Sequence, residues 1–153
     1  MYTKAEASAV KQKFWTSFGK YMQPVPSAFG EKVNWINYKT GIKGIFFKMD
    51  ANKDFASIAV EIFLPDTALQ NIYYQTFHNF TKQFEKLVGA EWVMEENFFT
   101  NDNKSVCMIY TELQHVNIFK ETDWPVIIVF LKKNIIALDA FWNLYKPAFE
   151  LLV

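Results

Sequence analysis

The segment "GIFFKMDANKDFASIAVEIFL", residues 44–64, is the most informative about the fold, because it predicts two strands joined by a short polar turn. Both sides of the turn are rich in β-branched and aromatic residues, which favour strands. The turn contains Asp50, Asn52 and Asp54, and these residue types readily form tight turns. We therefore expect a β-hairpin over about residues 44–64.

The second strand of this hairpin has two unlike faces, because successive side chains of a strand point to opposite sides. The even-numbered positions are all apolar: Ala56, Ile58, Val60, Ile62 and Leu64. The odd-numbered positions are mixed: Phe55, Ser57, Ala59, Glu61 and Phe63. This difference indicates one face in the core and one face of mixed character.

A second hairpin is predicted over about residues 91–113. The runs "EWVMEENFFT" and "KSVCMIYTEL" flank the tripeptide Asn101–Asn103. Asn and Asp tolerate the left-handed backbone conformation that tight turns require. The chain therefore repeats the arrangement of strand, polar turn and strand.

One helix is predicted before each hairpin: the first over about residues 4–22 and the second over about residues 66–88. Both segments carry apolar residues at helical spacing. The first ends at a stretch with two prolines and a glycine, which cannot continue a helix. Asp66 is a good N-cap for the second, and Gly89 is a good stop signal.

The last helix is predicted over about residues 123–152, with Thr122 or Asp123 as its N-cap and Pro125 in its first turn. Its apolar face is wider than one coiled-coil seam. Two interpretations remain: the helix covers the sheet, or part of it forms a homodimer surface. Pro147 should bend the last turns, because its ring removes a backbone hydrogen bond.

The element order is helix, hairpin, helix, hairpin, helix, which predicts an α+β fold. We expect a single domain over residues 1–153, with a mainly antiparallel four-stranded sheet packed by three helices. The length of 153 residues fits one domain of ordinary size. The composition, 51% hydrophobic and 18% aromatic, supports a sizeable core.

Charge and cysteine content exclude several classes of protein. The formal charge is zero and all sixteen basic residues are lysines. Broad affinity for nucleic acid is disfavoured, because a neutral chain without arginine lacks the usual bidentate donor to phosphate and guanine. Cys107 is the one cysteine, which excludes an internal disulfide and a cysteine-rich zinc site.

The sequence predicts a cytoplasmic protein without membrane contact. The first fifteen residues carry charges every few positions and lack the apolar region of a signal peptide. The longest apolar run, residues 124–131, is too short to cross a bilayer.

A search for catalytic motifs finds no glycine-rich phosphate loop, GxSxG, HExxH or CxxC pattern. His78 and His115 have no neighbouring acid at metal-ligand spacing, and Cys107 fits a small buried strand residue. A restriction-type nuclease motif is broken, because Phe63 stands where a lysine should follow Glu61. We therefore predict no catalytic residue, no metal and no cofactor, which favours a protein that is not an enzyme.

Glu61 and Glu112 lie inside apolar strands, where a charge is costly unless it is paired or solvated. Both could face water or pair with lysine across the sheet. They could instead form the polar centre of an aromatic groove with Tyr110. Two close carboxylates would push each other's pKa values apart, so an enzyme with a paired-carboxylate site stays open as an alternative.

Six blocks of the chain resemble a bacterial domain family of unknown function, catalogued as DUF 4268. The blocks are "FWTSFGKYM", "PSAFGEKVNWINYKTGIKGIFFKMD", "SIAVEI", "IYTEL", "DWPVII" and "IIALDAFW". The resemblance covers about residues 9–149 and implies bacterial origin, but it assigns no activity. The resemblance implies a domain that occurs both as a standalone small protein and as the C-terminal part of larger proteins with a nuclease-like front half. The resemblance therefore implies an accessory module in DNA-related or defence-related systems.

The family pattern includes "NWINYKTGI", residues Asn34 to Ile42, which has two interpretations. In the structural one, Trp35 and Tyr38 plug the edge of the sheet and Gly41 adopts a turn conformation. The functional interpretation presents four side chains to a ligand or partner: Asn34, Asn37, Tyr38 and Lys39.

Three functional hypotheses follow. The first is a non-catalytic interaction module that binds a protein partner or a second copy of itself. The second is association with nucleic acid through aromatic stacking and a segment without acids that contains Lys32, Lys39, Lys43 and Lys48. The third is the paired-carboxylate enzyme. The candidate binding residues are Asn34, Trp35, Asn37, Tyr38, Lys39, Glu61, Tyr110 and Glu112.

Overall fold

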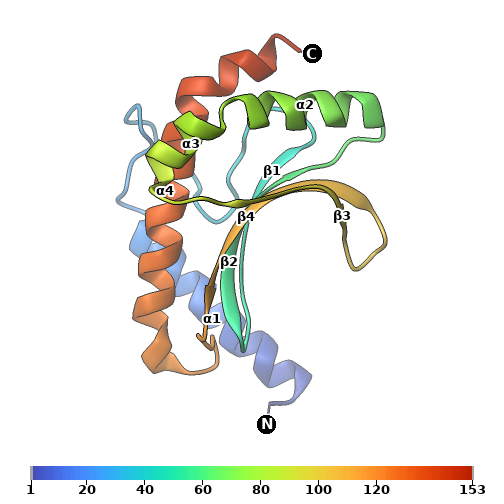
Figure 1. The fold of residues 1–153 in the computed structure, drawn as a ribbon. Coiled ribbons are helices and arrows are strands. Elements are labelled where there is room, and N and C mark those ends of the chain that lie inside the picture. The colour runs from blue at the N-terminus through green and yellow to red at the C-terminus, as the bar shows by residue number, and fades with distance from the viewer. Residues whose placement is uncertain (1, 153) are drawn as a thin grey trace.

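The computed structural model describes residues 2–152 and consists of one four-stranded sheet and four α-helices (Figure 1). The elements are α1 (Lys4–Met22), β1 (Ile45–Ala51), β2 (Phe55–Ile62), α2 (Thr67–Asn79), α3 (Thr81–Val88), β3 (Val93–Phe99), β4 (Ser105–Gln114), a 3-10 turn (Glu121–Asp123) and α4 (Trp124–Glu150). This arrangement confirms the predicted α+β class.

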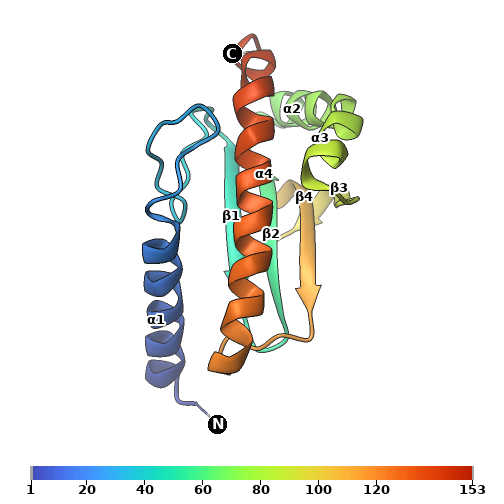
Figure 2. The same ribbon diagram turned by 90° about the vertical axis from the view of Figure 1, so that its left-hand side faces the viewer.

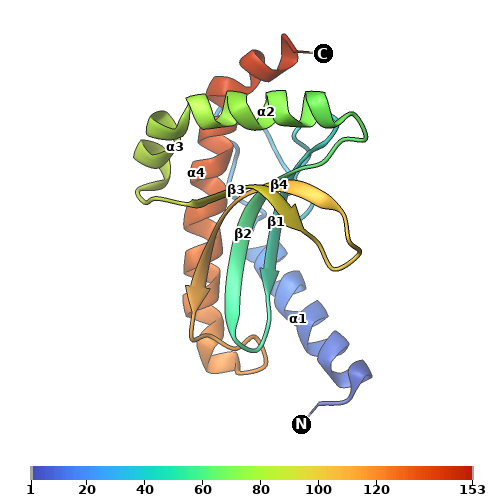
Figure 3. The same ribbon diagram turned by 45° about the vertical axis from the view of Figure 1, so that its right-hand side comes forward.

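The sheet has the strand order β1-β2-β4-β3, and all neighbouring strands are antiparallel. The two hairpins therefore join through β2 and β4. The pairing of β3 with β4 is irregular between Glu95 and Phe98, which is the mark of a β-bulge. Together, β3 and the beginning of β4 arch out of the plane of the first hairpin (Figures 1 and 3), so the sheet has a convex and a concave side.

The convex side of the sheet carries the core. The even-numbered residues of β2 are buried there: Ala56, Ile58, Val60 and Ile62. Both α2 and α4 pack against this side, while α1 lies beside α4 (Figure 2). The rings of Phe14 in α1 and Trp124 in α4 meet with their centroids 5.4 Å apart. Every helix thus contributes to the same aromatic core or lies along its border.

Most of the apolar stripe of α4 is used in this packing. Its buried apolar side chains are Trp124, Ile127, Leu131, Ile135, Leu138, Phe141, Trp142 and Phe149. Three large apolar side chains of α4 stay exposed, namely Val126, Val129 and Leu144. The last turns of α4, which contain Pro147, bend away from the rest of the helix (Figure 1), as expected from the hydrogen bond that proline removes. Among the described residues, no helix is long and apolar enough to cross a membrane.

The predicted helix over 66–88 is wrong in one respect, because it is two helices that break at Phe80. The backbone of Phe80 leaves the helical conformation at φ −98° and ψ 14°, and its N–H bonds to the carbonyl of Phe77. The break allows Phe77 in α2 and Phe84 in α3 both to contact Phe141, at centroid distances of 5.0 and 5.1 Å. The two helices therefore pack around the same aromatic ring of α4, and the sheet is accompanied by four helices instead of three.

The structure contains the predicted cap at Asp66, the stop at Gly89 and the turn at Asn103. The Asp66 carboxylate accepts hydrogen bonds from two backbone N–H groups of α2, and Gly89 ends α3 with φ 76°. Asn103 adopts φ 66° in the second hairpin turn. Asp123, one of the two predicted alternatives, is the N-cap residue of α4, but its carboxylate makes no capping hydrogen bond and instead accepts the N–H of Asn117 at 3.0 Å.

Candidate binding sites

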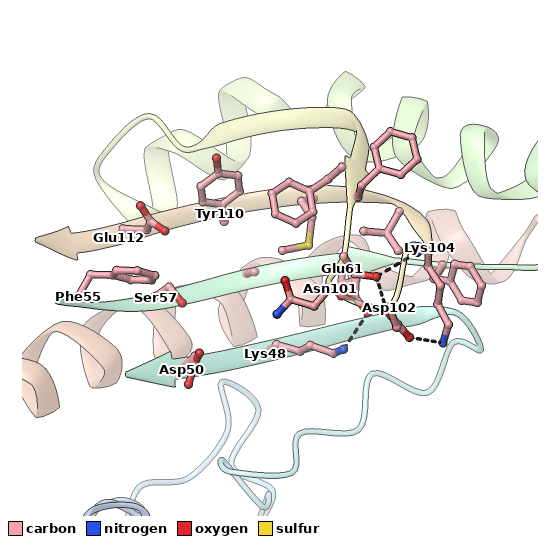
Figure 4. A pocket seen from close by; sticks show the side chains of 17 residues that line it. Lys48, Asp50, Phe55, Ser57, Glu61, Asn101, Asp102, Lys104, Tyr110 and Glu112 are labelled. Carbon is pink, nitrogen blue, oxygen red and sulfur yellow. Dashed lines mark hydrogen bonds and ion pairs between the residues drawn. The ribbon is translucent and has the colours of Figure 1, made fainter. Parts of the chain in front are cut away.

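The concave side of the sheet is hollowed into a cavity of about 660 Å³, which we call the open face (Figure 4). Its floor is formed by outward-facing residues of β1, β2 and β4, and the 100–104 turn forms one wall. The charged residues that line it are Lys48, Asp50, Glu61, Asp102, Lys104 and Glu112. The large apolar and aromatic ones are Phe55, Phe63, Phe98, Phe99, Val106, Met108 and Tyr110.

Glu61 lies on the floor of the open face, and its side chain is only 13% exposed. Lys48 of the neighbouring strand pairs with it at 2.8 Å between Nζ and Oε2. The same ammonium lies 5.6 Å from the ring centroid of Phe46. The charge of Glu61 is therefore balanced by a lysine on the adjacent strand.

The register does not bring Glu61 and Glu112 together, although both line the open face. Met108 stands opposite Glu61 and Glu112 stands opposite Ser57, four residues further along β2. At the usual strand rise, this offset is about 13 Å. Figure 4 shows the two carboxylates toward different ends of the cavity. Glu112 is exposed and accepts a hydrogen bond from Gln114 at 3.0 Å.

Tyr110 has an acidic partner that the sequence did not suggest. Its hydroxyl donates to the carboxylate of Glu95 on β3 at 2.9 Å. Burial, this hydrogen bond and the negative charges of Glu95 and Glu112 all raise the pKa of Tyr110. Strand alternation could have placed Glu95 on a face, but the pairing of β3 with β4 was needed to place it beside Tyr110.

The 100–104 turn brings further charges to the open face. Lys104 lies 5.1 Å from the ring centroid of Phe63 and 3.4 Å from the carboxylate of Asp102. A hydrogen bond from the Thr100 hydroxyl, and more weakly the Lys104 ammonium, lower the pKa of Asp102. In total, four carboxylates and two ammonium groups line the cavity.

A different kind of site surrounds the block Asn34 to Ile42. Trp35 is buried and its indole N–H donates to the carbonyl of Val25 at 2.9 Å. The Asn34 side chain accepts the N–H of Asn37 at 3.0 Å, which forms a local turn. Gly41 adopts φ 79°, a conformation that favours glycine. Three of these residues thus have structural contacts or conformations of their own.

A buried acid, Asp139 of α4, holds this block in place. Its carboxylate accepts hydrogen bonds from the Ser27 hydroxyl at 2.9 and 3.0 Å and from the Ala28 N–H at 2.8 Å. It also accepts from the side-chain amide of Asn143 at 3.0 Å and from the hydroxyl of Tyr38. Burial, followed by this bond and the charge of Asp139, raises the pKa of Tyr38. Sequence reasoning missed Asp139, whose signal was an isolated acid within the apolar stretch "IIALDAFW".

A second cavity of about 530 Å³, the loop cavity, lies between this block and the end of α4. Lys32, Lys39 and Lys146 line it, together with Asn37 and Asn143. Lys48 lies on the open face instead, so the lysine-rich segment is divided between two sites. The ring of Trp35 is only 3% exposed and cannot stack on a nucleic-acid base.

Within residues 2–152, no group of three or more His, Cys, Asp and Glu side chains could hold a metal ion. Cys107 is buried on the convex side, and burial is the main cause that raises the pKa of its thiol. Thiolate character is what makes a cysteine nucleophilic. Cys107 therefore lacks the exposure and the thiolate of a reactive cysteine.

These features define an α+β protein in which helices cover the convex side of a curved antiparallel sheet and a charged, aromatic cavity occupies the concave side. The chain belongs to the family described as Domain of unknown function (DUF4268), whose model matches residues 10–146. This match confirms the resemblance seen in the sequence. No curated protein and no solved structure was found to match the chain.

Proposed function

We propose that this protein is a non-catalytic interaction module whose open face binds a segment of another protein. The observation that carries the proposal is the concave sheet face, which combines a cavity of about 660 Å³ with aromatic side chains. Aromatic residues in hollows commonly provide most of the binding energy of a protein interface. A protein segment could cover these side chains without any change of the sheet.

The charge of the open face favours a basic partner. Four carboxylates and two ammonium groups line a cavity in a chain whose net charge is zero. Complementary charge guides association and disfavours wrong partners. The rings of Phe55, Phe98 and Tyr110 suit aliphatic and cationic side chains. We therefore expect a partner segment that alternates lysine or arginine with apolar residues.

The paired-carboxylate enzyme has less support. Glu61 is neutralised by Lys48, and Glu112 lies four residues further along the sheet. General acid–base catalysis by a carboxylate pair requires both groups to reach the same substrate bond. The separation between these two carboxylates argues against that arrangement, so we favour binding over catalysis.

Selection from a phage-displayed library of random peptides tests this proposal. We expect the protein to enrich peptides that combine basic and apolar residues, and a double variant, Phe55→Ala with Glu112→Lys, to lose their binding. Glu150→Lys is the matched control, because it makes the same charge change on an exposed residue of α4. Peptides that bind the double variant as tightly as the unaltered protein would refute a role for the open face, and so would a selection without enrichment.

A further inference from the structure

Three lysines line the loop cavity. Lys32 and Lys39 belong to the loop before β1, and Lys146 belongs to the last turns of α4. Within residues 2–152, none of their ammonium groups makes a hydrogen bond or an ion pair. Glu31 is the one carboxylate among the residues that line this cavity. Positive charge from two separate segments, the loop before β1 and the end of α4, thus converges on a hollow of about 530 Å³.

Lys146 is the least exposed of the three, and its ammonium group lies against Gly41. A Cβ added to Gly41 would lie 2.5 Å from Nζ and 3.1 Å from Cε of this lysine. The absence of a side chain at residue 41 therefore makes room for a cation. A partly buried ammonium group without an acceptor is costly, unless a ligand supplies the missing negative charge.

The walls of the loop cavity are fixed before any ligand binds. The indole N–H of Trp142 donates to the carbonyl of Thr40 at 2.8 Å. Asp139 holds the hydroxyl of Tyr38 and the side-chain amide of Asn143 from behind. Preorganised walls lower the entropic cost of binding a small molecule.

We propose that the loop cavity binds a small molecule that carries phosphate, and that Lys32, Lys39 and Lys146 contact its oxygens. The chain lacks arginine, whose planar fork binds carboxylate and phosphate alike, so lysines supply the cations of this site. Lysine acts as a point charge on phosphate, whose oxygens accept hydrogen bonds from several directions. The volume lies within the usual range for small-molecule sites. This inference does not depend on the proposed function of the open face.

Titration with pyrophosphate, followed by ¹H–¹⁵N NMR and calorimetry at constant ionic strength, tests the proposal. We expect saturable shifts of backbone amides in residues 31–40 and 142–146. Lys146→Met should weaken binding at least about tenfold, because it removes one charge-assisted contact. Lys133→Met is the matched control on an exposed position of α4 and should leave the affinity unchanged.

Three outcomes would overturn the proposal: no saturable binding, equal losses in Lys146→Met and Lys133→Met, or tighter binding of an oligothymidylate than of pyrophosphate with the same dependence on Lys146. The last outcome would identify a nucleic-acid contact instead. If Lys146→Met does not fold, Lys39→Met replaces it, because the Lys39 side chain is exposed. A loss of pyrophosphate binding in that variant supports the proposal, and unchanged binding contradicts it.

Discussion

The acidic groups of the open face and the acid behind the loop cavity differ in their exposure and in their partners. On the open face, Glu61 pairs with a lysine whose side chain is 56% exposed, and the other acids reach solvent. Behind the loop cavity, Asp139 is 1% exposed and accepts hydrogen bonds from four residues, while the ammonium groups of the nearby lysines have no acceptor among the described residues. Side chains on the open face rest on a surface that the sheet already defines. Around Asp139, by contrast, side-chain hydrogen bonds hold the loop against α4 and so form the surface itself.

The backbone explains this difference. The open face rests on regular ladders between β1, β2 and β4, whose hydrogen bonds do not depend on side chains. The loop between α1 and β1 has few backbone hydrogen bonds, among them Ser27 N–H to the Glu31 carbonyl. Where a loop without regular structure buries polar groups, side chains have to satisfy them. We therefore expect substitutions on the open face to alter binding, and substitutions around Asp139 to lower the stability of the fold.

Asp139→Ala should have the largest effect. It leaves the Ser27 hydroxyl, the Ala28 N–H and the Tyr38 hydroxyl without the carboxylate that accepts from them. We expect the free energy of unfolding to fall by about 3–5 kcal/mol, as for other broken buried polar networks. Urea unfolding followed by tryptophan fluorescence measures this change.

Glu61→Ala is the matched substitution on the open face. Its partner Lys48 can return to solvent, so we expect a loss of about 1 kcal/mol or less. Equal losses in the two variants would show that both regions depend on side chains to the same degree, and the contrast between them would fail.

The effect of Tyr38→Phe on the pH dependence of stability tests the same loop. The pKa of Tyr38 is raised above its ordinary value of 10.0, so the native state holds this proton more tightly than the unfolded chain. Its contribution to stability is complete below pH 10 and is lost as the pH rises further. We expect Tyr38→Phe to cost about 1–2 kcal/mol at neutral pH and to flatten the decline of stability above about pH 10.

The measurement is urea unfolding of both proteins from about pH 8 to 11. Cys107 and three other tyrosines also have raised pKa values, and they titrate in both proteins. The difference between the two curves therefore reports on Tyr38. Parallel curves would mean that the hydroxyl of Tyr38 does not bind its proton more tightly in the native state.

Tyr73→Phe makes the same chemical change at a hydroxyl without a partner. Tyr73 is fully buried, and its oxygen has no hydrogen bond within the described chain. Its ring packs against Phe149, at a centroid distance of 6.2 Å, and phenylalanine keeps that contact. We expect stability to stay unchanged or to rise by up to about 1 kcal/mol, because an unsatisfied polar group is removed. A loss as large as that of Tyr38→Phe would reveal a hydrogen-bond partner, such as a buried water.

The two regions also differed in how far the sequence could predict them. Alternation along β2 placed Glu61 on the face opposite to the buried Ile62, because strand parity is a local property. The offset between Glu61 and Glu112 was not predictable, since it depends on the pairing of β2 with a strand from the other hairpin. The site at Asp139 was hidden for a similar reason: its partners Ser27 and Tyr38 lie more than a hundred residues away in the chain.

The helices show the same limit. The ends of α1, the cap at Asp66 and the stop at Gly89 depend on neighbouring residues and were predicted correctly. The break at Phe80 depends on Phe141 and Tyr145 of α4, whose rings lie 6.4 and 4.6 Å from that of Phe80. Helical periodicity continues across the break, so no local pattern could reveal it.

The smallest expected effect is the coupling between Lys48 and Glu61. A double-mutant cycle with Lys48→Met and Glu61→Gln should give about 0.5 kcal/mol, because an ion pair with one exposed partner is partly screened by water. A weak pair suits the proposed function, since a partner's lysine or arginine could then replace Lys48 on Glu61 at little cost. Lys48→Met should accordingly bind a basic peptide as tightly as the unaltered protein or more tightly. A coupling above about 2 kcal/mol would instead make the pair a structural contact, and the basic segment would have to bind beside it, near Asp50 and Glu112.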